Sequence, residues 1–118
     1  MNLTDTHCHL ADPALRENLP HILTAAREAG VGRFIVPATR PQDWQDVADL
    51  AQRSSENPLW GNIHIALGIH PWFSEDVSEP DFQRLEQALR AHPTAWVGEI
   101  GLDFYDKTQT LPQRERQI

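Results

Sequence analysis

Hydrophobic residues follow two alternating patterns along this chain. Short apolar or β-branched runs recur, and they begin near Leu3, Arg33, Ile63 and Ala95. Successive runs start about 30 residues apart, which is the length of a strand, a helix and the return loop. Between the runs, apolar residues recur with the helical period in segments 19–29, 44–51 and 82–89. We therefore predict an α/β chain in which four parallel strands alternate with helices through right-handed crossovers.

Residues that commonly begin helices flank these segments. Pro20 and Pro41 suit the first turns of the first two helices, and Ser78 can cap the third. Thr110, followed three residues later by Gln113, predicts a capping box that opens a fourth helix. The chain then ends without a helix-closing signal, so we expect this helix to be cut short.

Four βα units in 118 residues amount to about half of a TIM-type parallel (β/α) barrel, which has eight units. We predict that residues 1–118 form a single incomplete domain, the N-terminal half of such a barrel, truncated to about four units. The alternative is a small open α/β sheet that is complete as it stands. A half-barrel exposes unpaired strand edges and apolar faces, so we expect aggregation or dimerisation when it is made alone.

Composition narrows the function classes. A net charge of −7 and a pI near 5.2 argue against generic polyanion binding, so a phosphate-bearing substrate would need a local positive centre. The single cysteine, Cys8, forms no intrachain disulfide, which agrees with a reducing compartment. The chain shows neither a signal-peptide pattern nor an apolar run near the roughly 20 residues that span a bilayer. We expect a soluble cytoplasmic protein, away from membranes, whose complete form is a monomer, and we predict no protein partner.

The first predicted strand ends in a segment with two histidines. His7 and His9 lie two positions apart, and the period of a strand points both imidazoles to one face. Imidazole suits Zn, Mn, Fe or Ni, and the carboxyl end of a barrel strand faces the active-site mouth. We predict a metal-ligand pair; the alternative is two ordinary histidines in the core or on the surface. Cys8 points to the other face, as a small buried hydrophobe rather than a ligand.

The fourth predicted strand, Trp96–Asp103, supplies acidic residues. Strict alternation places Glu99 and Asp103 on its inward face, with Glu99 deep and Asp103 near the loop. An inward carboxylate is costly unless it is paired, so the two readings are metal binding and a buried salt bridge. Gly98 and Gly101 leave room for another backbone, an ion or a ligand to approach closely, which favours metal binding.

The third predicted strand ends at His70, on the same rim. His70 can contact substrate or donate to a phosphate beside the metal site; alternatively, it only orders the turn at Pro71. Trp72 can form a wall of the mouth or pack on the following helix. We assign no role to His21, His64 and His92. The chain has no phosphate-binding glycine loop and no Gly-x-Ser-x-Gly motif, so a metal-activated water is the simplest nucleophile.

Three motifs, taken in order, carry a resemblance to a known family. The segments Thr4–Leu10 (TDTHCHL), Gly68–Pro71 (GIHP) and Val97–Asp103 (VGEIGLD) resemble the TatD family of metal-dependent deoxyribonucleases, within the amidohydrolase-like barrels. The match covers essentially the whole chain. Where family members often have an arginine after the last motif, this chain has Phe104–Lys107, with Lys107 as a less selective substitute.

The resemblance implies roles for five residues. It implies that His7 and His9 bind one divalent ion and that Glu99 bridges it to a second. It also implies that His70 and Asp103 lie beside the substrate phosphate and the attacking water, so that Glu99, Asp103 and His70 are the catalytic residues. The remaining ligands would come from later strands that this chain lacks.

The implied activity is hydrolysis of phosphodiester bonds in DNA, acting from strand ends, with two divalent metal ions (Zn, Mg or Mn) as cofactors. A nucleic acid is then the substrate and partner. Two alternatives stay open: the same barrel could hydrolyse a lactone, an amide or an aminoacyl-tRNA ester, or the chain could bind metal without turnover. We expect the isolated 118-residue chain to be inactive, because half of the ligands are absent.

Overall fold

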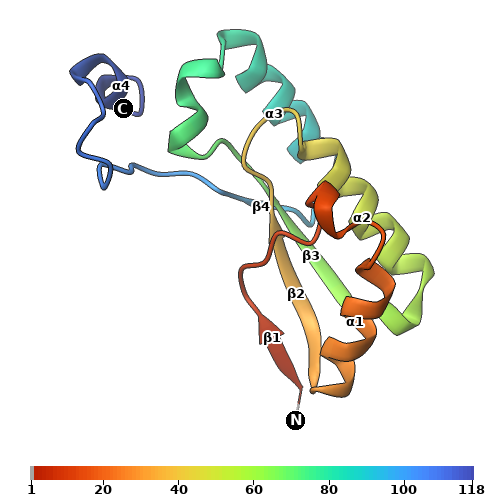
Figure 1. Cartoon of the computed structure of the whole chain (residues 1–118). Coiled ribbons are helices and arrows are strands. Elements are labelled where there is room, and N and C mark those ends of the chain that lie inside the picture. Colours follow the sequence, from red (N-terminus) through yellow and green to blue (C-terminus); the bar gives the residue numbers. More distant parts are fainter. Residues whose placement is uncertain (1) are drawn as a thin grey trace.

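The computed structural model describes residues 2–118, which form a parallel sheet in the order β1-β2-β3-β4. The strands are β1 (Leu3–Asp5), β2 (Val31–Pro37), β3 (Asn62–Leu67) and β4 (Trp96–Val97). The α-helices are α1 (Leu19–Glu28), α2 (Trp44–Glu56), α3 (Glu79–Ala91) and α4 (Leu111–Glu115). Short 3-10 helices are η1 (Pro13–Leu15), η2 (Pro58–Trp60) and η3 (Pro71–Asp76). Consecutive strands are neighbours, with helices between them (Figure 1), so the predicted α/β half-barrel of four βα units is confirmed.

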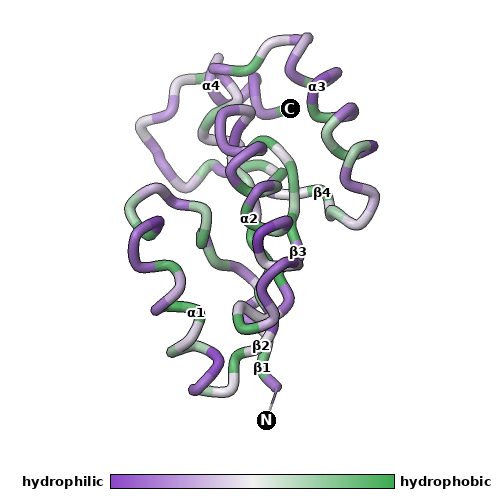
Figure 2. The backbone as a smooth tube through the Cα atoms, turned by 90° about the vertical axis from the view of Figure 1, so that its right-hand side faces the viewer, coloured by the Kyte–Doolittle hydropathy of each residue, from purple (hydrophilic) through white to green (hydrophobic). Residues whose placement is uncertain are grey.

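The core lies where α1 and α2 pack along β2 and β3. Its most completely buried large side chains are Leu23, Val36, Val47 and Leu67, one from each of these four elements. Burying an aliphatic side chain of this size contributes about 1.5–3 kcal/mol each. Figure 2 shows hydrophobic and hydrophilic residues alternating along the helices, as packing on one face requires. No helix within residues 2–118 combines the length and the hydrophobicity needed to cross a bilayer.

The predicted helix starts are confirmed at three of four positions. Pro20 lies in the first turn of α1, and Thr110 and Gln113 form the capping box that opens α4. At the start of α3, the backbone N–H and the hydroxyl of Ser78 donate to Asp81 Oδ2 at 2.9 and 2.7 Å. These hydrogen bonds lower the pKa of Asp81.

The prediction for Pro41 is wrong, because α2 begins at Trp44. The carboxylate of Asp43 accepts hydrogen bonds from the backbone N–H groups of Thr39 (2.9 Å) and Arg40 (3.2 Å) and from the Thr39 hydroxyl (2.7 Å). A side chain that bonds back to the preceding backbone favours a turn over a helix. The loop between β2 and α2 is therefore a fixed turn at the carboxyl edge of the sheet.

The fourth strand is shorter than predicted, because the chain leaves the strand after Val97 and crosses over the end of β3. Gly98 N–H donates to Leu67 O, and Glu99 N–H donates to Ala38 O, just past β2, both at 3.0 Å. The peptide bond between Gly98 and Glu99 is cis. Gly68, at the end of β3, makes the crossing possible: a Cβ there would lie 2.5 Å from Glu99 O and 2.6 Å from Gly98 C.

Gly68 is thus the glycine that is close to another backbone segment, whereas the sequence had indicated Gly98 and Gly101. A Cβ at Gly98 would make only an ordinary 3.5 Å contact with Ala66 Cβ, and a Cβ at Gly101 would meet nothing within 4 Å. Gly101 instead has a φ of 139°, which favours glycine where the chain turns away from the sheet. The close backbone approach that we expected at Gly98 and Gly101 is therefore found at Gly68.

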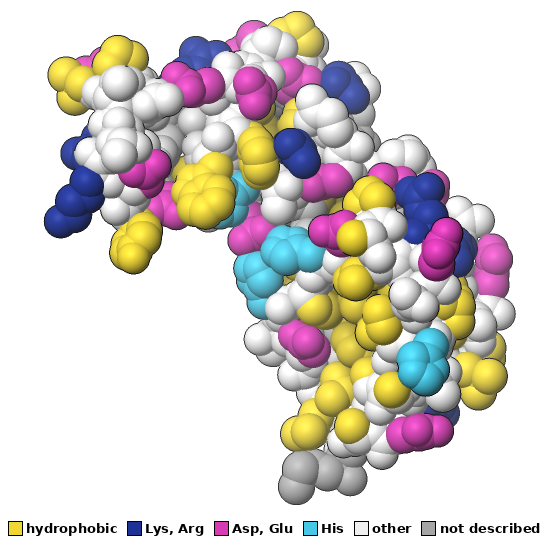
Figure 3. Space-filling model, viewed as in Figure 1, with side chains coloured by type: hydrophobic (Ala, Val, Ile, Leu, Met, Phe, Trp, Pro, Cys, Tyr) yellow, Lys and Arg dark blue, Asp and Glu magenta, His cyan; other side chains and the backbone are white. Residues whose placement is uncertain are grey.

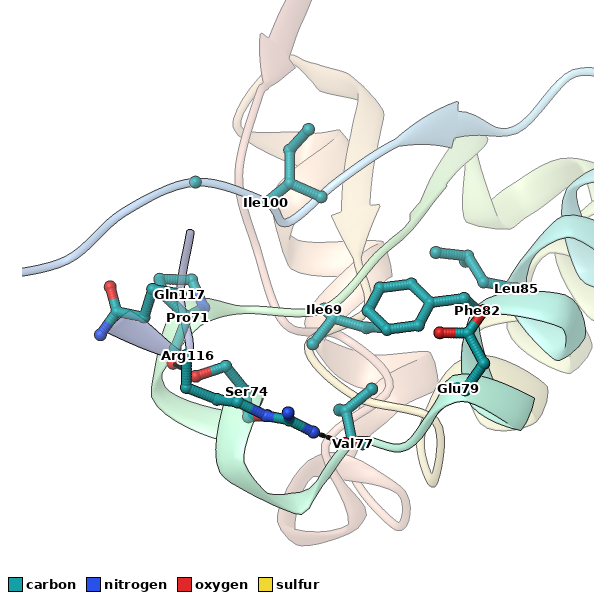
Figure 4. A pocket seen from close by; sticks show the side chains of 11 residues that line it. Ile69, Pro71, Ser74, Val77, Glu79, Phe82, Leu85, Ile100, Arg116 and Gln117 are labelled. Carbon is teal, nitrogen blue, oxygen red and sulfur yellow. Dashed lines mark hydrogen bonds between the residues drawn. The ribbon is translucent and has the colours of Figure 1, made fainter. Parts of the chain in front are cut away.

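The C-terminal segment packs back onto η3. Arg116 donates to the backbone oxygens of Ser74 (3.3 Å) and Val77 (2.7 Å), and Figure 4 shows its side chain reaching towards Val77. Beside it lies a cavity of about 420 Å³. Its apolar lining includes Ile69, Phe82, Leu85 and Ile100. These contacts tie the segment after β4 to the loop after β3.

We predict that Gly68→Ala destabilises the fold and moves Glu99, because the new methyl group meets backbone atoms that cannot rotate away. Overpacking of this kind costs about 1–3 kcal/mol. The matched control is Gly32→Ala, whose Cβ would approach only the flexible side chain of Asn2 within 3 Å. Thermal unfolding followed by circular dichroism should give a lower Tm for Gly68→Ala than for Gly32→Ala; equal values would show that the crossing tolerates a methyl group.

Candidate metal centre

Three side chains from opposite ends of the chain meet at the carboxyl edge of the sheet. His7 Nε2 lies 3.4 Å from Glu99 Oε1, and His9 Nε2 lies 3.8 Å from Glu99 Oε2. One ligand atom from each of His7, His9 and Glu99 lies within 4.8 Å of the others. Ligands about 2 Å from a common ion lie about 3–4 Å apart, so this nitrogen and oxygen set fits a divalent cation. Histidine and acidic side chains are seen together on this concave edge in Figure 3.

The histidines converge although they do not lie in a strand. β1 ends at Asp5, and the carboxylate of Asp5 accepts a hydrogen bond from His7 N–H at 3.1 Å, so the predicted strand through His9 is wrong. The segment stays attached to the sheet because Cys8 N–H donates to Ile35 O at 3.2 Å. The two imidazoles pack edge to face, with ring centroids 5.1 Å apart. Both rings therefore point towards Glu99 from a bent segment rather than from an extended one.

Cys8 turns away from the group, as predicted. Its side chain is half-buried against the core, and Sγ lies 3.6 Å from Ile35 O. Burial, reinforced by the charge of Asp5, raises the pKa of the Cys8 thiol to about 12. Since the thiolate is the form that binds metals, Cys8 is a poor ligand.

Glu99 is the best enclosed of the three ligands. Its side chain is 21% exposed, compared with 56% for His7 and 49% for His9. Its backbone is held by the hydrogen bond to Ala38 O. The group is thus fixed on the sheet side and open on the other, where further ligands or a substrate can approach.

His70 lines a cavity of about 680 Å³ together with His9 and Glu99. Its Nδ1 accepts a hydrogen bond from Trp72 N–H at 3.1 Å, and its own backbone N–H donates to Thr39 O at 2.7 Å. A neutral imidazole that accepts at Nδ1 carries its proton at Nε2. His70 therefore presents an N–H donor, and it also orders the turn at Pro71.

Asp103 does not join the three ligands. Because β4 ends at Val97, the predicted alternation that placed Asp103 beside Glu99 is wrong. Its carboxylate accepts hydrogen bonds from Trp72 Nε1 and from Tyr105 N–H, each at 2.8 Å. Asp103 thus holds the indole of Trp72, a residue that lines the cavity and remains 64% exposed. The role of Asp103 beside the attacking water stays a prediction.

Two further residues line this cavity, Arg40 and Phe73, and neither was predicted as a site residue. The Arg40 guanidinium lies 4.4 Å from the centroid of the Phe73 ring. One signal was available, since Arg40 follows the second strand and the carboxyl ends of parallel strands meet at one edge. Lys107, which we considered as a phosphate ligand, is exposed and does not line the cavity.

Known proteins are similar to this chain in both sequence and fold. The family model described as TatD related DNase matches residues 4–118. An uncharacterised metal-dependent hydrolase of Escherichia coli, YjjV, is 40% identical over 115 residues, covering 96% of this chain and 41% of the relative. The crystal structure of YjjV, a TatD homologue, superposes with a TM-score of 0.82 at 38% identity, over 98% of this chain and 42% of that one.

A second relative has a more specific name. The 3'-5' ssDNA/RNA exonuclease TatD of Edwardsiella piscicida is 27% identical over 113 residues, covering 96% of this chain and 42% of the relative. This chain therefore spans about two fifths of the length of the curated relatives that it matches.

We predict that His7→Ala, His9→Ala and Glu99→Gln each weaken the binding of Zn²⁺ or Mn²⁺ by at least about tenfold, because each removes one of three converging ligands. The matched control is His21→Ala, which removes an exposed imidazole from α1. Isothermal titration calorimetry on the folded variants measures the affinities. If the Glu99→Gln variant binds the metal as tightly as the parent chain does, Glu99 is not a ligand of the metal.

Proposed function

This chain belongs to the TatD related DNase family, and we propose that it contributes the first metal ligands and part of the substrate site of a hydrolase that cleaves phosphodiester bonds in nucleic acid. The observation that carries the proposal is the convergence of His7, His9 and Glu99 beside an open cavity. DNA is the substrate that we favour, and cleavage from strand ends is the mode, since one relative is named as a 3'-5' ssDNA/RNA exonuclease.

The three ligands would hold one divalent ion, and Glu99 has a second carboxylate oxygen with which to contact another. The proposed cofactors are two such ions, Zn, Mg or Mn, as the family resemblance implies. When bound, divalent ions supply Lewis acidity, which lowers the pKa of water and offsets phosphate charge. Within residues 2–118, no second group of three or more potential ligands was found, so the second ion would need donors from elsewhere.

The residues around the ligands suit a phosphate ester. His70 Nε2–H is a donor aimed by the turn at Pro71, and it can hydrogen-bond a nonbridging phosphate oxygen. Trp72 adds an exposed aromatic face whose orientation is held by the 2.8 Å hydrogen bond to Asp103. Single-stranded nucleic acids bind by stacking bases on such faces, at about 1–3 kcal/mol per base. A hydrogen-bond donor for phosphate beside a surface on which a base can stack favours nucleic acid over a lactone or an amide as substrate.

Two alternatives make different demands on the same residues. A hydrolase of lactones, amides or aminoacyl-tRNA esters would use the metal centre without a requirement for a stacked base. A metal-binding chain without turnover would hold the ion and do no more. We propose that the 118-residue chain by itself is of this last kind, because three protein ligands leave the centre open to solvent.

The activity is tested by placing this chain in a complete barrel. We predict that a chimera in which the chain replaces the matching segment of YjjV hydrolyses single-stranded DNA with Mn²⁺, whereas the isolated chain does not. In the chimera, Glu99→Gln should reduce the rate to background, while His21→Ala should keep it. Rates on RNA, lactones, amides and acylated tRNA are measured alongside, with unaltered YjjV as reference. Faster turnover of one of these substrates would replace the DNA proposal.

The stacking surface gives a separate prediction. Trp72→Ala should weaken single-stranded DNA binding to the chimera by about tenfold, through loss of a stacked base, whereas Trp72→Phe should keep most of the affinity. The control is Trp96→Ala, because Trp96 is also exposed but lies on β4 and stacks on His64 instead. Fluorescence anisotropy of a labelled oligonucleotide measures the affinity. Equal losses for Trp72→Ala and Trp96→Ala would exclude a specific role for Trp72.

A further inference from the structure

Arg40 is held in place by two independent contacts. Its backbone N–H donates to Asp43 Oδ1 at 3.2 Å, within the fixed turn that follows β2. Its guanidinium lies over the ring of Phe73, 4.4 Å from the centroid, in a cation–π contact. The first contact fixes the backbone of Arg40, and the second restricts the rotamers of a long side chain that would otherwise sample many. Arg40 is therefore largely positioned before any ligand binds.

The charge of Arg40 is also available. Among the described residues that line the 680 Å³ cavity, it is the only Lys or Arg. Within residues 2–118 it forms no ion pair. The three aspartates that line the same cavity have other partners: Asp43 accepts from the turn, Asp12 accepts from Ala14 N–H at 2.8 Å, and Asp46 pairs with Arg16 at 3.4 Å.

The cavity thus has two distinct polar regions. Glu99 and His9 belong to the metal centre, and Arg40 supplies a planar, permanently charged fork of donors suited to bidentate binding of a phosphate. Arg40 is exposed, and its guanidinium makes no hydrogen bond within residues 2–118, so its N–H groups can donate to a ligand. Because both regions line the same cavity, a ligand that carries two phosphates would find a polar partner for each of them.

We propose that Arg40 binds the phosphate next to the scissile phosphodiester of a nucleic-acid strand, so that the site prefers substrates with a second phosphate beside the one at the metal centre. This inference rests on the proposed function, because it takes the scissile phosphate to lie at His7, His9 and Glu99. Arg40 is then a specificity-determining residue, and the sugar–phosphate backbone, rather than a base, is the ligand that it recognises.

The test compares two probes on the 118-residue chain with Mn²⁺, using a thymidine dinucleotide with its single internal phosphate and the same dinucleotide with an added terminal phosphate. Isothermal titration calorimetry should show that the parent chain binds the second probe more tightly. Arg40→Gln and Arg40→Ala should each lower the affinity for the second probe by about tenfold and leave the first nearly unchanged, because one charge-assisted contact is lost. Arg40→Lys should restore part of the difference.

Salt dependence supplies a readout that a purely structural role would not change. For a single-stranded oligonucleotide, loss of one phosphate contact should reduce the slope of log affinity against log salt by about 0.7. The matched control is Arg53→Ala, since Arg53 is also stacked on an aromatic ring, that of Trp60 at 5.0 Å, but does not line this cavity. Arg53→Ala should leave both the slope and the preference for the second probe unchanged.

Several results would overturn the inference. These are equal affinity of the parent chain for the two probes, an unchanged preference in Arg40→Gln, or an equal loss in Arg53→Ala. Failure of the proposed function gives a different pattern: the preference for the second probe would depend on Arg40, while the YjjV chimera would fail to hydrolyse DNA. Conversely, if the chimera hydrolyses DNA but Arg40→Gln leaves the affinities for both probes unchanged, the proposed function is supported and the proposed role of Arg40 is excluded.

Discussion

The crossing of the chain over Gly68 is the constraint on which the candidate site depends. β1 and β4 are the two edge strands of the sheet. Side chains at their carboxyl ends would therefore not meet if the chain continued straight on from each strand. The Glu99 backbone passes over Gly68 and donates to Ala38, which brings the carboxylate across β3 towards the segment that follows β1. A side chain at position 68 would occupy the space that the Glu99 backbone now fills.

Charge in this molecule is organised locally rather than overall. The net charge of −7 disfavours a phosphate-bearing ligand at long range. The acidic residues around the cavity are nevertheless bonded to the turn, to η1 or to Arg16, which leaves the Arg40 guanidinium free to contact an anion. An acidic chain can therefore present a cationic contact beside its metal ligands without attracting polyanions elsewhere on its surface.

Much of the fold, but less of the site, was predictable from the sequence. The helical period located the segments that became α1, α2 and α3, because each buries one face against the sheet. Strand alternation was a poor guide beyond Asp5 and Val97, where side-chain hydrogen bonds and the crossing replace the extended backbone. His7, His9 and Glu99 lie together, but strand alternation is not the reason. Their segments leave the strands and bend towards one another, which is a tertiary effect that no local pattern encodes.

Asp103 and Arg40 also show why the site could not be fully predicted from local patterns. Alternation placed Asp103 with the ligands, whereas in the structure it accepts a hydrogen bond from Trp72. The end of the second strand indicated the edge at which Arg40 lies, but the position of its guanidinium depends on an aromatic ring from η3. The site is therefore a property of the assembled sheet. Since His7 and Glu99 come from opposite ends of the chain, an ion held between them would bind the folded chain in preference to the unfolded one. Metal binding and folding of the chain are then thermodynamically linked.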